Sequence, residues 1–530
     1  MQFGKSCASV LMLALCLVST ALAQTIFPAT PDWESADRPY STGGALVDLN
    51  RDGWLDFVVA NGNDMARQRL VVYYNNGNGT FPANPNWNSG DLEYNGHISI
   101  ADVNGDGWDD VAVALTQDGY NMRTARLYLN NQGTLSSLPD WVSADTYAAF
   151  HVAFGDVNGD GRPDLAVGTG FPYSGSHVWR NYVYYNVNGT LETLPSWVSA
   201  DTYDYMDIFF CDVDRDGRQD LVGVGTNTHT RVYRNNAGVL ATTSTWTTLD
   251  NSGQFSVMGT YGDVNADGWF ELLVTDNTQL FAGSGYFRRY DGLIGGLFSQ
   301  YPTWSYYEGY GSAVALADLD ADGDLDLATG GWWDYTRYFL GTAGAFPPFP
   351  SWSSSGTSVV EAICFGDVDN DALRSRTQWY DVSGTPGRHL FHLPHQPVQW
   401  IEAVNADGST LTPAQYTCDL VHGWVSIGPA AGQWVSLRYA YSLKPDMAIT
   451  NWDNQGNYLY YNRNSATRFG DANDDDSVDL DDFLAFVACL TGPGPMDPPP
   501  STACRRAFDA DGDADVDMAD FRELTIVLAF

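Results

Sequence analysis

Short apolar runs alternate along the chain with clusters of aspartate, asparagine and glycine, and the alternation repeats about every 50 residues. One unit contains a β-like run at 151–154, an acidic loop, an apolar run at 165–168, an aromatic run at 182–185 and a tryptophan segment. The runs are short, lack helical periodicity and are separated by turn residues such as Asn-Gly. Each unit is therefore predicted to form four short strands.

Two markers divide the chain into the same number of units. Aspartate loops begin at Asp48, Asp102, Asp156, Asp212, Asp263, Asp318 and Asp367, and Pro-x-Trp type segments carry Trp33, Trp87, Trp141, Trp197, Trp246, Trp304 and Trp352. Both markers occur seven times. Four-stranded units repeated radially are typical of an all-β, seven-bladed β-propeller rather than a solenoid.

The two ends of the repeat region complement each other. The segment from Ile26 to Trp33 has no aromatic run before it, and the last aromatic run, Tyr458 to Tyr461, has no tryptophan segment after it. A ring removes exposed sheet edges. We therefore expect residues 24–464 to form the propeller, with the N-terminal strand completing the last blade.

The seventh loop is interrupted after Asp371. The motif Lys444-Pro445-Asp446 matches Arg162-Pro163-Asp164 in the third loop, so Asp446 is predicted to return as the ninth loop position. Residues 372–443 then form an insertion whose runs at 398–401, 424–427 and 434–437 are strand-like. We expect a small β module on the rim, since exposed loop tips tolerate insertions.

The loops have the spacing of a calcium site. Side-chain oxygens at positions one, three, five and nine, with the carbonyl of position seven, can surround a hard cation, as in an EF-hand but between strands. The candidate ligands are Asp48, Asn50, Asp52, Asp56; Asp102, Asn104, Asp106, Asp110; Asp156, Asn158, Asp160, Asp164; Asp212, Asp214, Asp216, Asp220; Asp263, Asn265, Asp267, Glu271; Asp318, Asp320, Asp322, Asp326; and Asp367, Asp369, Asp371, Asp446. Glu271 at position nine and Ala372 at position six predict weaker fifth and seventh sites.

These seven loops resemble the FG-GAP/VCBS repeats of integrin-α-like propellers, and the resemblance covers residues 24 to about 464. It implies a propeller whose loops bind structural calcium. An integrin-like surface protein would have a protein ligand.

Residues 465–530 repeat the loop chemistry in a different frame, each copy followed by an apolar, helix-like run. The candidate ligands are Asp471, Asn473, Asp475, Asp479 and Asp482 in one copy and Asp509, Asp511, Asp513, Asp517 and Asp520 in the other. The pair resembles a type I dockerin, a small α-helical domain that implies a cohesin-like partner. Asp476 and Ala514 at position six depart from that pattern, and so does the absence of a small hydroxyl pair at positions ten and eleven. With this module the chain would bind about nine calcium ions.

Two cysteines, Cys489 and Cys504, flank a Pro/Gly-rich loop between these copies. In an oxidising compartment they can form a disulfide; the alternative is two unpaired thiols.

The N-terminus and the charge indicate an exported protein. Residues 1–23 have a basic Lys5, an apolar core and a small-x-small end, as a secretory signal peptide does. No later run is long enough to span a bilayer. The net charge of −39 disfavours nucleic acid and anionic membranes. We therefore expect a secreted or cell-surface protein.

Catalytic candidates are few. His97, His151 and Asp207 each lie five residues before a loop and are expected near the central channel, as a catalytic or metal cluster or as polar channel lining. His389, His392 and His395 have a zinc-like spacing, but Pro394 and strand alternation separate their side chains.

Aromatic residues after the second strands could stack on sugar rings or fill spaces between blades. They are Phe171, Tyr173, Trp332, Trp333 and Tyr335.

The leading hypothesis is a binding and attachment protein, with a carbohydrate or protein ligand on the propeller and an assembly tail. The alternatives are a polysaccharide lyase or O-glycosyl hydrolase and an integrin-like adhesion protein. The first is favoured because no catalytic signature stands out.

Overall fold

The computed structural model describes residues 25–117, 123–170, 179–226, 228–250, 256–279, 284–385, 387–429, 431–464 and 480–490, and residues 504, 508, 516, 520, 521 and 524. The expected leader, residues 1–23, and most of the expected module 465–530 lie outside these residues. Within the repeat region, the longest segment outside them is 171–178.

Five antiparallel sheets of the repeat region have four strands each. Within each sheet the strands lie side by side in chain order, and in the fifth a small hairpin separates the third and fourth strands along the chain. They are β2 (Ser41–Val47), β3 (Asp56–Asn61), β4 (Leu70–Tyr73), β5 (Trp87–Asn88); β6 (Asn95–Ala101), β7 (Asp110–Leu115), β8 (Ala125–Tyr128), β9 (Trp141–Val142); β10 (Ala149–Gly155), β11 (Asp164–Thr169), β12 (Tyr182–Tyr184), β13 (Trp197–Val198); β14 (Tyr205–Cys211), β15 (Asp220–Gly225), β16 (Arg231–Tyr233), β17 (Trp246–Thr247); and β18 (Ser256–Gly262), β19 (Glu271–Asp276), β20 (Tyr286–Tyr290), β23 (Trp304–Tyr307). The small hairpin of β21 (Gly292–Leu293) and β22 (Leu297–Phe298) precedes β23. Valine and alanine recur in the second strands, which are buried along their whole length.

A sixth sheet joins the two ends of the repeat region. Its order is β1 (Trp33–Glu34), β35 (Tyr458–Tyr460), β34 (Asp446–Asn451), β26 (Trp352–Gly366), β25 (Asp326–Phe339) and β24 (Gly311–Ala317). Trp33 pairs with Leu459, so the first described strand is the outer strand beside the last aromatic run. The long strand β26 continues from one repeat into the next.

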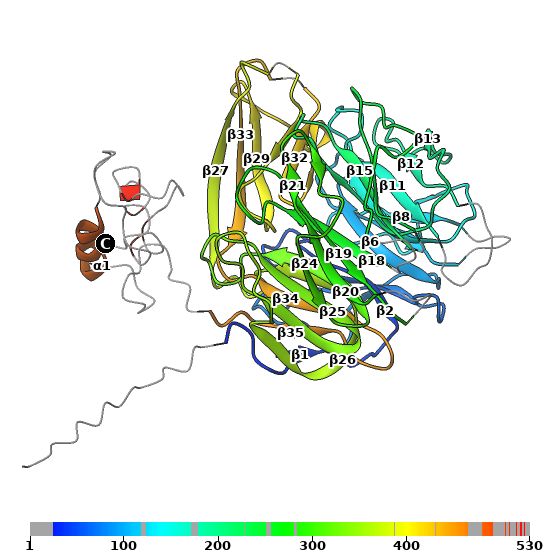
Figure 1. Ribbon diagram of the computed structural model, residues 1–530, viewed down its shortest axis with the longest axis horizontal. Helices are drawn as coiled ribbons and strands as arrows, with labels where there is room; N and C mark the ends of the chain where they lie inside the picture. The colour runs from blue at the N-terminus through cyan, green and yellow to red at the C-terminus, as the bar shows by residue number, and fades with distance from the viewer. Residues whose placement is uncertain are drawn as a thin grey trace, which may run out of the picture.

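The first strands of the sheets form a closed ring. β2 contacts β6, and contacts then run to β10, β14, β18, β24 and β26, which contacts β2 again. Apolar clusters fill the space between neighbouring sheets; one contains Val58 and Val72 of the first sheet and Val111 of the second. This arrangement is a β-propeller (Figure 1).

The insertion forms two further sheets. β27 (Leu373–Asp381), β33 (Trp434–Ser442), β29 (Trp400–Ala406) and β30 (Ser409–Thr410) make one, and β28 (Leu390–His392), β32 (Trp424–Ile427) and β31 (Tyr416–Asp419) make the other, with a short 3₁₀ helix, η1 (Pro413–Gln415), before β31. An apolar core containing Val404, Val425 and Leu437 lies between them. The module is thus a small β-sandwich (Figure 1).

The sequence suggested that the module lies on the rim. In the structure it packs instead against the loops of several repeats. β31 contacts β6 and β10. The His422 ring stacks on Tyr261 with centroids 4.2 Å apart, and Gln396 Nε2 donates to the Tyr261 carbonyl at 3.0 Å. Gln396 thus satisfies a backbone carbonyl of the propeller that a rim position of the module would leave to water.

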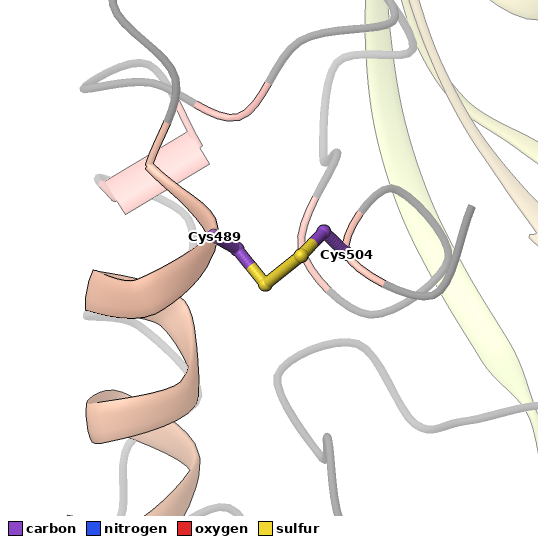
Figure 2. The surroundings of a disulfide bond; sticks show 2 residues. All are labelled: Cys489 and Cys504. Atoms are coloured by element: carbon purple, nitrogen blue, oxygen red, sulfur yellow. A yellow bond between two sulfur atoms is a disulfide. The ribbon is translucent and has the colours of Figure 1, made fainter. Parts of the chain in front are cut away.

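The C-terminal region contains α1 (Leu480–Cys489) and a cluster of Phe486, Phe508, Val516 and Leu524. A disulfide joins Cys489 to Cys504, with Cα atoms 5.4 Å apart (Figure 2). Among the described residues, no helix has the length and apolar character that crossing a bilayer requires.

Candidate metal centres

Each loop folds around the carboxylate at its first position. Asp102 Oδ1 accepts a hydrogen bond from Asp106 N at 3.1 Å, and Oδ2 accepts one from Gly107 N at 2.6 Å. Gly107 has φ 94°, a left-handed conformation that glycine adopts without strain. In the seventh loop Ala372 takes this place outside the left-handed region and leads directly into β27.

The ninth position joins the loop to the sheet. Asp110 Oδ2 accepts from Val103 N at 2.9 Å, and Oδ1 accepts from Asn130 N at 2.7 Å. Burial raises the pKa of Asp110 to about 8. Burial likewise raises the pKa of Asp220 to about 8 and that of Asp326 to about 9, with further upward contributions from neighbouring carboxylates. Among the described residues no basic side chain pairs with Asp110 or Asp326, and a bound cation would supply the compensating charge there.

Asp446 takes the ninth place in the interrupted seventh loop. It pairs with Gly366 across β26 and β34, as Asp164 pairs with Gly155 in the third repeat. Its Oδ2 accepts from Val368 N at 2.9 Å and its Oδ1 from Asn462 N at 2.8 Å. The loop therefore resumes after the 372–443 insertion with the same hydrogen bonds.

Three loops bring carboxylates close enough to share one ion. One oxygen from each residue lies within 4.8 Å of the others in the groups Asp212, Asp214, Asp216; Asp318, Asp320, Asp326; and Asp367, Asp369, Asp371. All the donors are oxygens, the donor type that suits calcium and magnesium. The residues present therefore fit a hard divalent cation.

Arginines pair with ligand positions of the third, fourth and fifth loops; Arg162 and Arg218 lie within the third and fourth loops and contact Asp160 and Asp216. The Arg234 guanidinium contacts Asp214, and its Nε lies 3.7 Å from Asp220 Oδ2. In the fifth loop Arg289 Nη2 lies 3.9 Å from Glu271 Oε2. Each guanidinium neutralises part of the charge that a metal ion would otherwise balance. No sequence signal marked Arg234 and Arg289, because Arg234 follows β16 and Arg289 lies on β20, both outside the loops.

An asparagine after the third strand links neighbouring repeats. Asn186 Nδ2 donates to the Val103 carbonyl of the preceding loop at 2.8 Å, and Asn186 Oδ1 accepts from Gly189 N at 2.8 Å. Equivalent bonds to the preceding loop are made by Asn75, Asn130, Asn235 and Asn462. Sequence reasoning treated this asparagine only as part of a turn.

The inserted module reaches the loops directly. Ser426 Oγ donates to Asp156 Oδ2 at 2.8 Å, and Ser442 Oγ donates to Asp367 Oδ2 at 2.8 Å. A cavity of about 210 Å³ lies between the module and the third loop, lined in part by Asn158 and His389. The module therefore adds hydroxyl groups to two of the candidate centres.

The three channel candidates come together on neighbouring inner strands. His151 Nδ1 lies 3.0 Å from Asp207 Oδ1, and the His97 and His151 rings have centroids 5.1 Å apart. Burial lowers the pKa of His97 and raises that of Asp207. His97 and Asp207 are almost fully buried, so these groups resemble channel lining more than an open active site.

The histidines of the insertion have separate partners. His389 Nδ1 lies 2.6 Å from the Ile427 carbonyl, His392 Nε2 lies 3.7 Å from Asp212 Oδ2, and His395 Nδ1 lies 2.7 Å from the Tyr439 hydroxyl. They do not converge on one centre.

The aromatic candidates divide by exposure. Trp332 is buried, whereas Trp333 is 44% and Tyr335 is 40% exposed. Trp333 Nε1 donates to Asp453 Oδ2 at 3.0 Å. Phe171 and Tyr173 lie outside the described residues, as do the C-terminal candidate ligands except Asp482, of whose side chain nothing is described, and Asp520, which is buried.

Comparison with known families gives four matches to the FG-GAP-like repeat, at residues 48–113, 102–167, 212–274 and 263–329. The chain is 29% identical over 140 residues to human "Integrin alpha-6", which covers 24% of this chain and 12% of that protein. It is also 29% identical over 109 residues to chicken "Integrin alpha-6", covering 19% and 10%. The match thus spans about an eighth or less of these relatives' length.

Among solved structures, two crystal structures of BBS1N in complex with ARL6DN match with TM-scores of 0.43. The one soaked with lead is 12% identical and covers 66% of this chain and 93% of that chain. The one soaked with mercury is 11% identical and covers 78% and 96%.

Proposed function

We propose, from the premise that the chain carries integrin-like FG-GAP repeats folded as a β-propeller, that it is a calcium-stabilised extracellular binding and attachment protein. The observation that carries this proposal is the convergence of carboxylates in the loops. In the fourth and seventh loops one oxygen of each of three aspartates lies within 4.8 Å of the others, and the first of them, Asp212 or Asp367, is buried. Buried acids of this kind are stabilised by a cation bound among oxygen donors. Because the chain is similar to integrin alpha-6, the proposal includes an extracellular ligand.

The finer parts of the proposal are seven blades within residues 24–464, calcium as the cation, and a signal peptide at 1–23. The closed ring of first strands supports the blade number. The Ser426 and Ser442 hydroxyls bond a ligand of the third and of the seventh loop, whereas Arg234 and Arg289 favour weaker sites in the fourth and fifth. The seventh site remains predicted to be weaker, because of Ala372 and the nearby Lys444. The module at 465–530 would attach the protein to a cohesin-like partner.

Calcium titration of the metal-free protein by calorimetry tests the scaffold. We expect several sites per chain, and one fewer strong site in Asp110→Asn, because an amide cannot replace the charge of that buried ligand. Asp140→Asn is the matched control, because Asp140 lies outside the loops, where its Oδ2 accepts a hydrogen bond from Leu129 N. Unchanged stoichiometry and affinity in Asp110→Asn would contradict the assignment.

A second candidate function, polysaccharide cleavage, rests on the close approach of His151 to Asp207. Incubation of the protein with plant and algal polysaccharides separates the two functions. Retention on the polymer without new reducing or unsaturated ends supports binding, and release of such ends supports cleavage. If His151→Ala still releases reducing or unsaturated ends, His151 and Asp207 do not carry out the cleavage.

A further inference from the structure

The sheet of the inserted module that contains β27, β33 and β29 has two chemically different sides. Along β33, Val435, Leu437 and Tyr439 point into the core of the module. Because side chains alternate along a strand, Trp434, Ser436 and Arg438 occupy the opposite side. The other sheet of the module, through β31, contacts the propeller. The opposite side of the β27–β33–β29 sheet, here called the outer face, is therefore directed away from the module's own core.

Two tryptophans dominate this outer face. The rings of Trp379 and Trp434 have centroids 4.9 Å apart with planes inclined by 51°, and Trp379 is 59% exposed. Asp407 Oδ1 accepts from Trp434 N at 3.0 Å and so anchors the start of the strand. Trp434 is partly exposed beside Trp379. Indoles held on a rigid sheet offer a large contact area with little entropy to lose on binding.

The rest of the outer face is polar and electrically balanced. Arg438 Nε donates to Glu402 Oε2 at 2.5 Å, and Ser375 Oγ donates to Glu402 Oε1 at 2.5 Å. Asn405 Nδ2 donates to Ser436 Oγ at 3.3 Å. The Arg438 side chain is 58% exposed, so its remaining donors are open to a ligand.

We propose that this outer face binds a neutral polysaccharide, with a sugar ring stacked on Trp379 and Trp434 and its hydroxyls bonded to Arg438 and Glu402. A pyranose ring combines an apolar C–H face, which suits the electron-rich face of an indole, with hydroxyls at its edge that suit paired donors and acceptors. The net charge of −39 disfavours an acidic polymer. A protein partner or a second copy would require a wider apolar surface than these two rings provide.

This inference rests on the proposed binding function and assigns its ligand class and location. The test is affinity electrophoresis of the full, calcium-loaded chain through gels that contain cellulose derivatives, xylan, mannan or, as the acidic comparison, polygalacturonate. We expect retardation by a neutral polymer and a loss of affinity of about tenfold or more in Trp379→Ala. Arg438→Ala should weaken binding less, because the stacking surface remains.

Trp333→Ala is the matched control, since it removes an equally bulky exposed indole from the propeller. Thermal melting of each variant in calcium checks that it remains folded; if Trp379→Ala is unfolded, Trp379→Phe and Arg438→Ala decide the question. Equal retention of wild type and of these variants would overturn the site while leaving the binding function intact. If Trp333→Ala is the one variant that loses retention by the polymer, the binding site lies on the propeller and the outer face is excluded. Binding of polygalacturonate alone, or of no polymer by a calcium-loaded wild type, would overturn the ligand class, and failure to bind calcium would instead contradict the proposed function.

Discussion

At the residue scale, Glu361 shows how burial alters an acid that lies outside the metal loops. It is completely buried on β26, and Asn63 Nδ2 donates to its Oε1 at 3.4 Å. Burial, followed by the negative charge of Asp64, raises the pKa of Glu361 to about 8. The folded protein therefore holds a proton on this side chain at pH values where the unfolded chain has released it.

Glu361→Gln should accordingly change how stability depends on pH. Because the folded-state pKa lies above the unfolded value, the stability linked to this carboxyl is complete below about pH 4.5 and falls as the pH rises to about 8. Between pH 5 and pH 9, in saturating calcium, wild type should lose about 2 to 4 kcal/mol more than the variant. Urea unfolding measures this difference, with Glu192→Gln as control. Parallel pH curves for wild type and Glu361→Gln would contradict it.

At the element scale, the asparagine links show how one repeat fixes the next. Asn186 is buried and bridges the third strand of its own sheet to the loop of the preceding repeat. The same asparagine backbone N–H satisfies the ninth-position carboxylate Asp164 at 2.8 Å. Metal loop and blade interface are therefore coupled through a single residue.

Asn186→Ala should destabilise the folded protein by about 1 to 3 kcal/mol, because the Val103 carbonyl and Gly189 N–H lose a buried partner. Asn131→Ala is the matched control, since Asn131 is exposed and bonds Ser136 locally. Chemical unfolding in calcium measures both variants. If the free energy of unfolding of Asn186→Ala equals that of wild type within error, Asn186 does not stabilise the contact between neighbouring repeats.

At the scale of the whole molecule, the loops sit between strands around a closed ring, so the cation should stabilise the entire propeller. A ligand that binds only the folded state raises stability in proportion to the logarithm of its free concentration once that concentration exceeds the dissociation constant. Chelation with EDTA should therefore lower the melting temperature by more than about 10 °C. Scanning calorimetry with and without EDTA tests this, and re-addition of calcium should restore the transition. An unchanged melting temperature would contradict a structural role for the metal.

The propeller was accessible from sequence because its repeats impose local rules. The spacing from Asp102 to Asp110 recurs in the first six loops, and a tryptophan begins the outer strand of each repeat, so pattern and structure coincide in the propeller. Even the return of Asp446 followed from a short motif. The position of the inserted module was not accessible, because its seating depends on contacts such as His422 with Tyr261, which join residues far apart in the chain. The Arg234 contact with Asp214 was hidden because Arg234 follows β16, outside the loop motif.

The pairing of β1 with β35 also sets an order for events during synthesis. Asn457 N donates to Ser35 Oγ at 3.0 Å across 422 positions of the chain. While the ribosome is still translating the later repeats, β1 has no partner and the ring stays open. Late, long-range pairing is slow and exposes strand edges in the meantime. The ring of sheets therefore keeps open edges until residues 458–460 reach β1, and this pairing is the step that covers them.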